Sequence, residues 1–404
     1  MREKFAILVL LAFATLGAEA QLLPSRRELF LREEALRNPV GDVDFDALHR
    51  RQDTLTLLFI GDVMAHGPMI ENAYRMHCKT HPGARKDDPA SYDWSAFLRR
   101  LEAPVAAADL AVCNMEFPLA GYPYTGYPCF SAPDTYADYL TGLGFDVLLT
   151  ANNHILDKGQ AGLVRTVRAC DALESTGRVR YTGISANEAD DTARYPLIID
   201  LKGVRIALVN FTYGTNTGPS ARWPKVNRMQ REDIGKALRR AREQDADYII
   251  VLPHWGIEYR HRHSPEQEDL ARWMVANGAD LIIGTHPHVP QDIQYIDGKP
   301  VLYSLGNAVS NQQDPKCRLE LAATVRILLH RNGSTTLDRP EVSFLWCAHP
   351  STVEDSYTVL PVAEYLPRPE AWRSPSDHDS MARTYQETLK ATGIDEEKPL
   401  PGSH

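Results

Sequence analysis

Short runs of apolar residues, rich in β-branched side chains, recur along the chain, and each ends in polar or glycine residues. These runs lie at residues 54–60, 110–113, 145–150, 195–201, 204–210, 248–252, 280–283 and 301–305. Apolar runs of this length between turn-forming residues predict β-strands. The pair Lys202-Gly203, which separates two of the runs, predicts a hairpin turn.

Apolar residues spaced three and four positions apart fill several gaps between these runs. The spacing predicts amphipathic helices over residues 133–143, 159–174, 231–244 and 265–277. Ser264 before Pro265 is typical of a helix start. Strands that alternate with helices predict an α/β fold, and continuous apolar strands such as 248–252 predict a sheet covered on both faces.

The first 20 residues have the pattern of a secretory signal peptide. A basic start precedes a 13-residue apolar run over residues 5–17, and Ala18 and Ala20 form a small-x-small cleavage site. A membrane-spanning helix needs about 20 apolar residues, so this run is short for an anchor. We therefore expect export to the periplasm or the outside, with cleavage near Ala20 and no transmembrane anchor afterwards.

The remaining chain divides by composition. We expect a polar N-terminal arm over residues 21–53 and the main domain over 54–312. Residues 313–365 are strand-rich and should complete the same domain, and the polar residues 366–404 should form a peripheral tail. A length of 404 residues is compatible with one large α/β domain.

The net charge and the cysteines narrow the class of protein. A formal net charge of −9 lacks the basic footprint of a nucleic-acid-binding protein, so we expect no nucleic-acid partner. Six cysteines suit an exported chain, where disulfides persist. They allow 15 full pairings. The pairs that we consider are Cys78 with Cys129 and Cys317 with Cys347, with Cys113 and Cys170 as buried thiols.

Five of the apolar runs are followed within a few residues by side chains that can bind metal ions. These side chains are Asp62 and His66; Asn114 and Glu116; Asn153, His154 and Asp157; His254; and His286 and His288. Ligand sites in open α/β sheets lie at the carboxyl ends of strands, so we expect these groups to converge. Imidazole and carboxylate together suit Zn, Mn or Fe, and shared ligands can hold two ions for hydrolytic chemistry.

Each motif also has an ordinary structural interpretation. Asp62 could form a turn or a helix cap, Glu116 could pair with an arginine, and His254 could be a hydrogen-bonded core residue. No single motif is specific for a metal site, and it is their order along the chain that is specific.

That order resembles the bacterial capsule or poly-γ-glutamate synthesis (CapA-type, PGA_cap) family, which is related to calcineurin-like metallophosphoesterases. The motifs are GDVM at 61–64, NME at 114–116, and the segments 151–163, 254–259, 278–291 and 303–307. The resemblance spans roughly residues 54–312. It implies a four-layer αββα metallophosphoesterase-like sandwich with mixed sheets.

The resemblance also implies roles for individual residues. Asp62 and His288 would bind a first metal ion, His254 and His286 a second, and Asn153 would bind metal beside His154 at the substrate. Glu116 takes the place of a bridging aspartate. Met64 stands where the related enzymes have a histidine, and His66 is the candidate replacement.

These residues lead to one main hypothesis and two alternatives. The main hypothesis is an exported hydrolase or transferase with one or two divalent ions, in which Asp157 orients His154 as proton donor. Asn114, Arg260 and Asn307 are the candidate substrate-binding residues. The substrate would be an anionic polymer, or a peptide or sugar of the cell surface, handled with a polymer synthesis or export complex. The alternatives are a non-catalytic accessory protein that binds an anionic polymer, and an exported phosphoesterase or nucleotidase.

Overall fold

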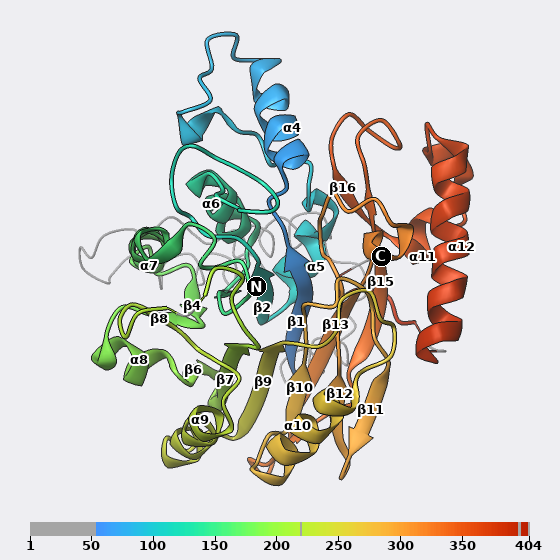
Figure 1. Ribbon diagram of the computed structural model, residues 1–404. Helices are drawn as coiled ribbons and strands as arrows, with labels where there is room; N and C mark the ends of the chain where they lie inside the picture. Colours follow the sequence, from blue (N-terminus) through green and yellow to red (C-terminus); the bar gives the residue numbers. More distant parts are fainter. Residues whose placement is uncertain (1–53, 219, 395–396, 403–404) are drawn as a thin grey trace, which may run out of the picture. The chain divides into compact units, whose positions relative to one another are not determined.

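Two large β-sheets form the centre of the computed structural model, which describes residues 54–218, 220–394 and 397–402 (Figure 1). The first sheet has the order β16 (Thr358–Pro361), β15 (Glu341–Ala348), β13 (Leu319–Leu329), β1 (Thr54–Val63), β2 (Leu110–Met115), β3 (Val147–Leu149) and β4 (Arg180–Thr182), with β14 (Thr335–Leu337) paired to β13. The second has the order β11 (Ile293–Ile296), β12 (Lys299–Leu302), β10 (Leu281–Ile283), β9 (Tyr248–His254), β7 (Val204–Thr212) and β6 (Leu197–Leu201). A small sheet pairs β5 (Ile184–Ser185) with β8 (Lys225–Val226).

Both large sheets are mixed. In the first, β1, β2, β3 and β4 are parallel neighbours, while β1, β13, β15 and β16 pair antiparallel. In the second, β7, β9, β10 and β12 are parallel, and β6 and β11 pair antiparallel at the two edges. The parallel strands of each sheet therefore end together at one edge, where side chains distant in sequence can meet.

Helices surround the sheets and connect the strands. The α-helices are α4 (Gly67–Cys78), α5 (Glu102–Ala107), α6 (Asp134–Leu143), α7 (Gly159–Glu174), α8 (Glu188–Arg194), α9 (Arg231–Glu243), α10 (Pro265–Ala276), α11 (Val362–Tyr365) and α12 (Pro375–Thr392). Short 3-10 turns lie at η1 (Pro89–Ser91), η2 (Arg99–Leu101), η3 (Pro315–Arg318) and η4 (Pro369–Ala371).

Three apolar clusters separate four layers. One lies between the sheets and joins residues such as Phe59 and Val112 of the first to Leu208 and Ile250 of the second. A second packs the other face of the first sheet against α5, α6 and α7, and a third packs the second sheet against α9 and α10. The predicted αββα sandwich with mixed sheets is confirmed.

The periodicity of the sequence located several elements closely. The four predicted helices match α6, α7, α9 and α10 to within one residue at each end, and the hairpin at Lys202-Gly203 joins β6 to β7. The predicted start of α10 is confirmed by a capping box, in which Ser264 and Gln267 each accept the other's backbone N–H. Strands β1, β2 and β9 run two or three residues further than their apolar runs, through the buried polar residues Asp62, Asn114 and His254.

The C-terminal segment departs from the expected peripheral tail. It contains α12, and its residues Trp372, Met381 and Ile394 belong to the cluster between the sheets. This packing could not be predicted from the sequence, because apolar residues are sparse in this polar segment. The predicted signal peptide (1–20) and arm (21–53) lie outside the described residues. Among the described residues, no helix combines the length and apolar character that crossing a bilayer requires.

The disulfide pairings that we considered are not formed, because all six cysteines are free. The Cys129 thiol donates to the carbonyl oxygen of Asp157 at 2.7 Å, and the Cys347 thiol donates to that of Ser310 at 3.4 Å. Cys113 and Cys170 are buried thiols, as expected.

A bidentate ion pair anchors α12, and we predict that breaking it lowers the stability of the protein strongly. Arg318, which is 7% exposed, donates to the two Asp377 carboxylate oxygens at 2.7 and 2.8 Å. Asp377→Ala leaves this guanidinium buried without a counter-charge, so we expect the free energy of unfolding to fall by about 3 kcal/mol. Asp87→Ala, which breaks the exposed pair with Arg85, should cost less than about 1 kcal/mol. Urea unfolding of both variants measures the difference, and equal losses would contradict the assigned anchor.

Candidate metal centre

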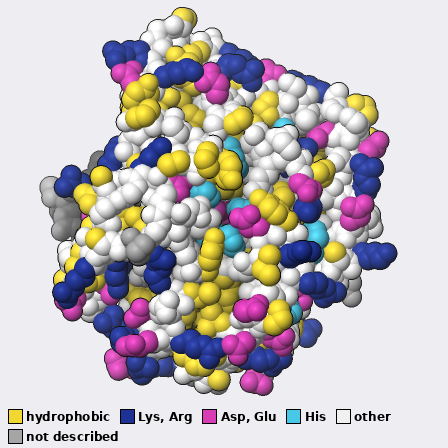
Figure 2. All heavy atoms as spheres, viewed as in Figure 1, with side chains coloured by type: hydrophobic (Ala, Val, Ile, Leu, Met, Phe, Trp, Pro, Cys, Tyr) yellow, Lys and Arg dark blue, Asp and Glu magenta, His cyan; other side chains and the backbone are white. Residues whose placement is uncertain are grey.

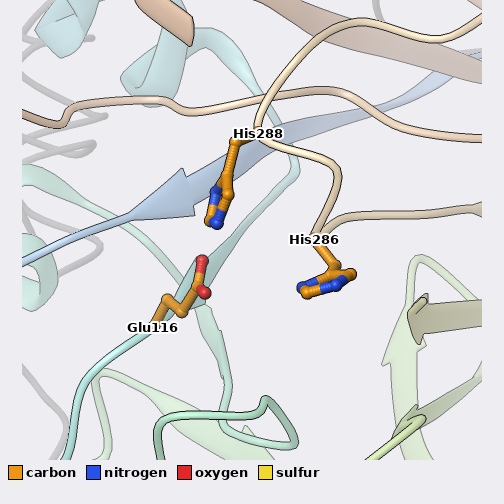
Figure 3. A group of neighbouring side chains, drawn as sticks. All are labelled: Glu116, His286 and His288. Atoms are coloured by element: carbon orange, nitrogen blue, oxygen red, sulfur yellow. The ribbon is translucent and has the colours of Figure 1, made fainter. Parts of the chain in front are cut away.

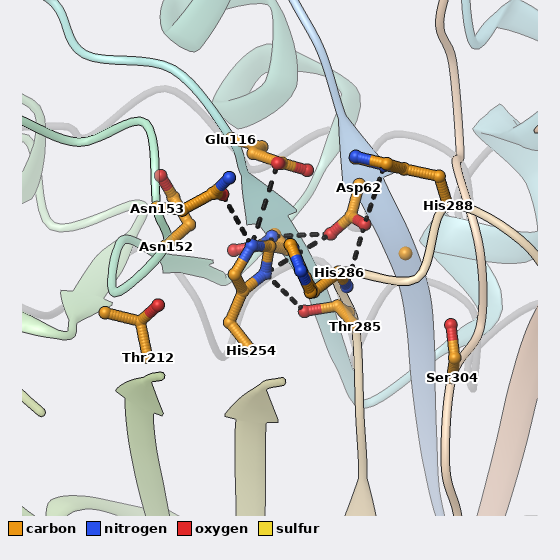
Figure 4. A network of polar contacts seen from close by, with 12 residues as sticks. Asp62, Glu116, Asn152, Asn153, Thr212, His254, Thr285, His286, His288 and Ser304 are labelled. Carbon is orange, nitrogen blue, oxygen red and sulfur yellow. Dashed lines mark hydrogen bonds and ion pairs between the residues drawn. The ribbon is translucent and has the colours of Figure 1, made fainter. Parts of the chain in front are cut away.

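Five buried side chains meet where the strands of the two sheets end, and we call them the histidine–carboxylate cluster. The cluster consists of Asp62, Glu116, His254, His286 and His288 (Figure 4). Asp62 lies near the end of β1 and Glu116 directly after the neighbouring β2, both in the first sheet. His254 ends β9 in the second sheet, and both remaining histidines follow the neighbouring β10.

The Asp62 carboxylate is fixed from two sides. Its Oδ1 accepts the Asn114 side-chain amide at 2.6 Å, and its Oδ2 accepts the backbone N–H of His286 at 3.0 Å. The Asp62 backbone N–H donates to the Gly306 carbonyl at 2.9 Å. A Cβ on the preceding Gly61 would lie 1.9 Å from that same carbonyl oxygen, so only glycine permits this close crossing.

His254 lies beside residues from the ends of four other strands. Its Nε2 lies 2.8 Å from Asn153 Oδ1 and 3.6 Å from a Glu116 carboxylate oxygen. Its Nδ1 lies 3.0 Å from Thr285 Oγ1 and 3.8 Å from an Asp62 oxygen. The ring is fully buried, so these polar groups replace all of its contacts with water.

His286 and His288 come from a tight loop whose backbone is held in an uncommon conformation. Their φ angles are 98° and 60°, in the left-handed region that non-glycine residues seldom adopt. This conformation aims both rings toward Glu116 (Figure 3). His288 Nδ1 also lies 2.8 Å from Asn307 Oδ1, which fixes the orientation of its ring. Such strained backbone is concentrated at functional sites.

The buried polar atoms of this cluster are not all satisfied by the protein. Both Glu116 carboxylate oxygens, Asn114 Oδ1 and His286 Nδ1 lack a hydrogen-bond partner among the described residues. Buried polar atoms normally have partners, and an unpaired set is evidence for a bound ion or water. The same oxygen and nitrogen atoms are good ligands for a divalent transition metal. The residues present therefore fit a metal ion.

Two overlapping sets of ligands can be drawn from the cluster. One is Glu116, His286 and His288, and the other is Asp62, Glu116 and His254. Within each set, the candidate ligand atoms lie within 4.8 Å of one another. Glu116 belongs to both sets, which is the arrangement of a carboxylate shared by two ions.

Burial shifts the proton affinity of these groups. Removal from water raises the pKa of Asp62 and raises that of Glu116 well above its ordinary value, and the nearby Asp62 charge raises the Glu116 pKa further. The same desolvation lowers the pKa of His254 and of His286 well below the ordinary value. His254 and His286 are therefore neutral, which is the form that binds metals, and a bound cation would relieve the cost of the buried carboxylates.

His154 and Asp157 form a separate pair beside the cluster. His154 Nδ1 lies 2.7 Å from Asp157 Oδ2, and the same oxygen accepts the Phe130 backbone N–H at 2.8 Å. The Asn216 side-chain nitrogen lies 3.3 and 3.4 Å from the two ring nitrogens of His154. A carboxylate that fixes one ring nitrogen leaves the other available for proton transfer.

The structure brings most of the predicted site residues together. Asn114 and Asn153 both contact His254, Asn114 at 3.2 Å from its Nδ1. Asn307, predicted to bind substrate, is buried instead: its oxygen contacts His288, and its amide donates to Gln312 and to the Cys317 carbonyl.

His66 and Arg260 are among the predicted residues that lie outside the cluster. His66 Nδ1 accepts the Asn311 backbone N–H at 3.2 Å, and the His66 ring packs edge-on against Phe130. Burial lowers the pKa of His66 to about 3, so the ring is neutral, and it belongs to neither ligand set. Arg260 is exposed, and no hydrogen bond or ion pair among the described residues links its guanidinium to the cluster.

Two contact residues were missed by the sequence analysis. The Tyr213 ring lies over the cluster, with its centroid 4.5 Å from that of His286, and Thr285 contacts His254. Neither residue type carries a metal-binding signal, and both contacts depend on how distant segments pack. Only the position of each residue just after a predicted strand could have marked it.

Comparison with known proteins gives the following. A family model described as "Bacterial capsule synthesis protein PGA_cap" matches residues 56–312. A Bacillus anthracis "Capsule biosynthesis protein CapA" is 29% identical over 301 residues, covering 72% of this chain and 67% of that protein. A Bacillus subtilis (strain 168) "PGA biosynthesis protein CapA" is 34% identical over 199 residues, covering 48% and 50%. The matches thus span between half and two thirds of these relatives.

Solved structures with a similar arrangement are more distant. The NAD nucleotidase of Haemophilus influenzae has a TM-score of 0.41 at 12% identity, with 86% of this chain and 65% of that chain covered. A sulfate thiohydrolase of Thermus thermophilus has a TM-score of 0.39 at 14% identity, with 90% and 63% covered.

Because the Glu116 carboxylate is unpaired, we predict that it destabilises the folded protein when no metal is bound. In protein treated with a chelator at pH 7, Glu116→Gln should raise the free energy of unfolding by about 1–3 kcal/mol, because it removes a buried unpaired charge. The folded pKa is raised, so the gain should shrink as pH falls toward the ordinary glutamate pKa of about 4.3. Glu387→Gln, exposed on α12, is the matched control. Loss of stability in Glu116→Gln would contradict the interpretation.

Proposed function

This chain belongs to the PGA_cap family of bacterial capsule synthesis proteins, and from that premise we propose that it is a metal-dependent hydrolase or transferase that acts in the biosynthesis of a cell-surface polymer. The polymer class that the relatives' names suggest is capsule or poly-γ-glutamate. We further propose that the protein is exported through its N-terminal segment and acts beside polymer synthesis or export machinery. The signal-peptide pattern of residues 1–20 supports this location.

The observation that carries the proposal is the buried Glu116 carboxylate. Neither of its oxygens has a hydrogen-bond partner among the described residues, and His254, His286 and His288 surround it. An isolated buried carboxylate is costly unless it is neutralised or binds a cation. A divalent ion held there would polarise a substrate oxygen and lower the pKa of a bound water.

The chain's own residues supply the binding site for one or two such ions. Asp62, Glu116, His254, His286 and His288 would provide the charged and imidazole ligands, and Asn153 an amide oxygen. Asn114, Thr285 and Asn307 would hold these ligands in place through the hydrogen bonds described above. Outer partners of this kind orient metal ligands and fix imidazole tautomers. Zn, Mn or Fe suits this set of ligands.

His154 would move the proton. The Asp157 carboxylate stabilises a proton on His154 Nδ1, and the Phe130 N–H keeps that carboxylate aligned. His154 Nε2 then remains to donate a proton to a leaving group or to stabilise developing negative charge. His154 is 4% exposed, so this transfer would occur with little competition from bulk water.

A non-catalytic accessory role is the second candidate. His66, the expected replacement for a missing histidine ligand at Met64, is outside both ligand sets. A site with fewer ligands favours binding without turnover. Such an accessory protein would keep the fold and would bind polymer without loss when His154 is replaced.

Metal content tests the proposal directly. The full chain, purified without chelator or histidine tag, should contain one to two transition-metal ions per chain by plasma mass spectrometry. Glu116→Gln and His286→Ala should each lose most of this metal, because each removes a central ligand. His81→Ala, which removes an exposed histidine away from the cluster, should retain it. A wild-type chain that stays metal-free after incubation with Zn²⁺ and Mn²⁺ would overturn the proposal.

Replacing His154 separates catalysis from binding. His154→Ala should keep the metal but lower turnover about 10²–10⁴-fold, the usual range for loss of a general acid or base. Suitable probes are bis(4-nitrophenyl) phosphate and γ-glutamyl-4-nitroanilide, with release of the nitroaromatic product followed by absorbance. Asp157→Asn should lower turnover less and shift its pH profile, because the proton on Nδ1 loses its charged partner. Unchanged turnover in His154→Ala would exclude it as the proton donor.

A further inference from the structure

A second feature lies beside the cluster, and we call it the Tyr127 hollow. It has a volume of about 530 Å³, and its lining includes His66, Tyr127, Tyr259, Asn311, Gln312 and Gln313. This volume is within the usual range of about 300–1,000 Å³ for small-molecule sites. Nothing in the proposed metal chemistry uses its tyrosines or its amides.

The hollow adjoins the reacting groups on two sides. The Tyr259 ring lies 6.0 Å from that of His288, centroid to centroid, and the Tyr259 N–H donates to the Pro287 carbonyl at 2.8 Å. His66 packs against Phe130, whose ring in turn lies 4.6 Å from that of His154. Histidine side chains gather near the centre of the face shown in Figure 2, with hydrophobic and acidic side chains around them. The hollow is therefore one ring away from the cluster, through Tyr259, and two rings away from the proton donor, through His66 and Phe130.

The charge around the hollow is unfavourable for a polyanion. Among the residues that the structure describes, no lysine or arginine lines it. Lys316 is the cation that contacts its wall, 5.8 Å from the Tyr259 ring centroid, and it is paired with Asp314 at 3.2 Å. Glu258, an exposed acid, precedes Tyr259. A densely charged anionic chain would need unpaired cations here, and the described residues of the lining offer none.

The lining presents uncharged polar groups, namely tyrosine hydroxyls and side-chain amides. Tyr127 is 74% exposed and Tyr259 is 43% exposed, so each presents an aromatic face with a hydroxyl to solvent. The Asn311 side-chain oxygen accepts the Tyr357 hydroxyl, and the Gln312 oxygen accepts the Asn307 amide at 3.0 Å. These bonds orient both amides and leave their nitrogens as donors, since neither nitrogen has a partner among the described residues.

We propose that the Tyr127 hollow is a subsite for a neutral sugar unit of the polymer. The C–H face of a sugar ring packs on a tyrosine ring, and its hydroxyls match the amide donors and phenol groups. This proposal specifies the substrate class of the proposed enzyme, so it rests on the proposed function. Of the two polymer classes named above, the subsite thus selects a glycan capsule over poly-γ-glutamate, with one sugar unit held in the hollow and the adjoining bond at the cluster.

Binding of uncharged oligosaccharides tests this subsite. Tetrasaccharides of glucose, of galactose and of N-acetylglucosamine are titrated calorimetrically into the full chain, beside a tetramer of γ-linked glutamate and a neutral tetrapeptide. At least one tetrasaccharide should bind, with a Kd that changes less than twofold between 50 and 500 mM NaCl because no charges are paired. Tyr127→Ala should weaken binding tenfold or more.

Tyr122 provides a matched control. It is 59% exposed, precedes a proline as Tyr127 does, and does not line the hollow. Tyr122→Ala should change the oligosaccharide Kd less than twofold. Failure of all three tetrasaccharides to bind, or equal effects of the two tyrosine variants, would overturn the subsite. Binding of the γ-glutamate tetramer or of the tetrapeptide that depends on Tyr127, with no sugar bound, would do the same.

The test is independent of the metal chemistry. Tyr127→Ala should retain the wild-type metal content, and Glu116→Gln should retain sugar binding, because the two sites share no residue. If the protein binds metal but no sugar, only the subsite proposal is overturned. If it binds no metal, the proposed function is overturned, whether or not the protein binds sugar.

Discussion

A carboxylate buried without a partner is the constraint on which the rest of the structure depends. Glu116 is fully buried beside a second buried carboxylate, Asp62, and three buried imidazoles, of which burial keeps His254 and His286 neutral. A fold that only needed stability would replace these groups with apolar side chains. Their retention at the meeting point of both sheets is explained by a cation that pairs with them. The proposed metal centre is thus the compensation that the buried charges require.

The backbone around the cluster is adapted to that role. Gly61 allows β1 to cross the Gly306 carbonyl, which places Asp62 at the end of the first sheet. The left-handed conformations of His286 and His288 turn a loop of the second sheet back toward the first. Two mixed sheets that pack face to face thereby supply one site from four strand ends. The side chains that fix Asp62 and His288 are those of Asn114 and Asn307, which hydrogen-bond to them directly.

The sequence predicted what depends on local periodicity and on strand ends. Helix α7 could be read from spacing alone, and the start of α10 from Ser264 and Pro265, because capping chemistry is local. The meeting of Asp62 with Glu116 followed from the rule that parallel strands of one sheet end together, whereas His254 reaches them from the second sheet. Long-range packing could not be read in this way. His66 follows the same motif as Asp62, yet its ring is held by Phe130 and Asn311, which are distant in sequence. Helix α12 was concealed because so few of its residues reach the core.

A crystal structure measured at the zinc absorption edge would test the central claim most directly. Crystals of the full chain grown with Zn²⁺ should show an anomalous peak about 2.0–2.2 Å from a Glu116 oxygen and from the ring nitrogens of at least two cluster histidines. A second peak on the Asp62 side would establish that Glu116 bridges two ions. No peak inside the cluster, with zinc bound only at exposed histidines, would contradict the claim that the buried carboxylates are there to hold metal.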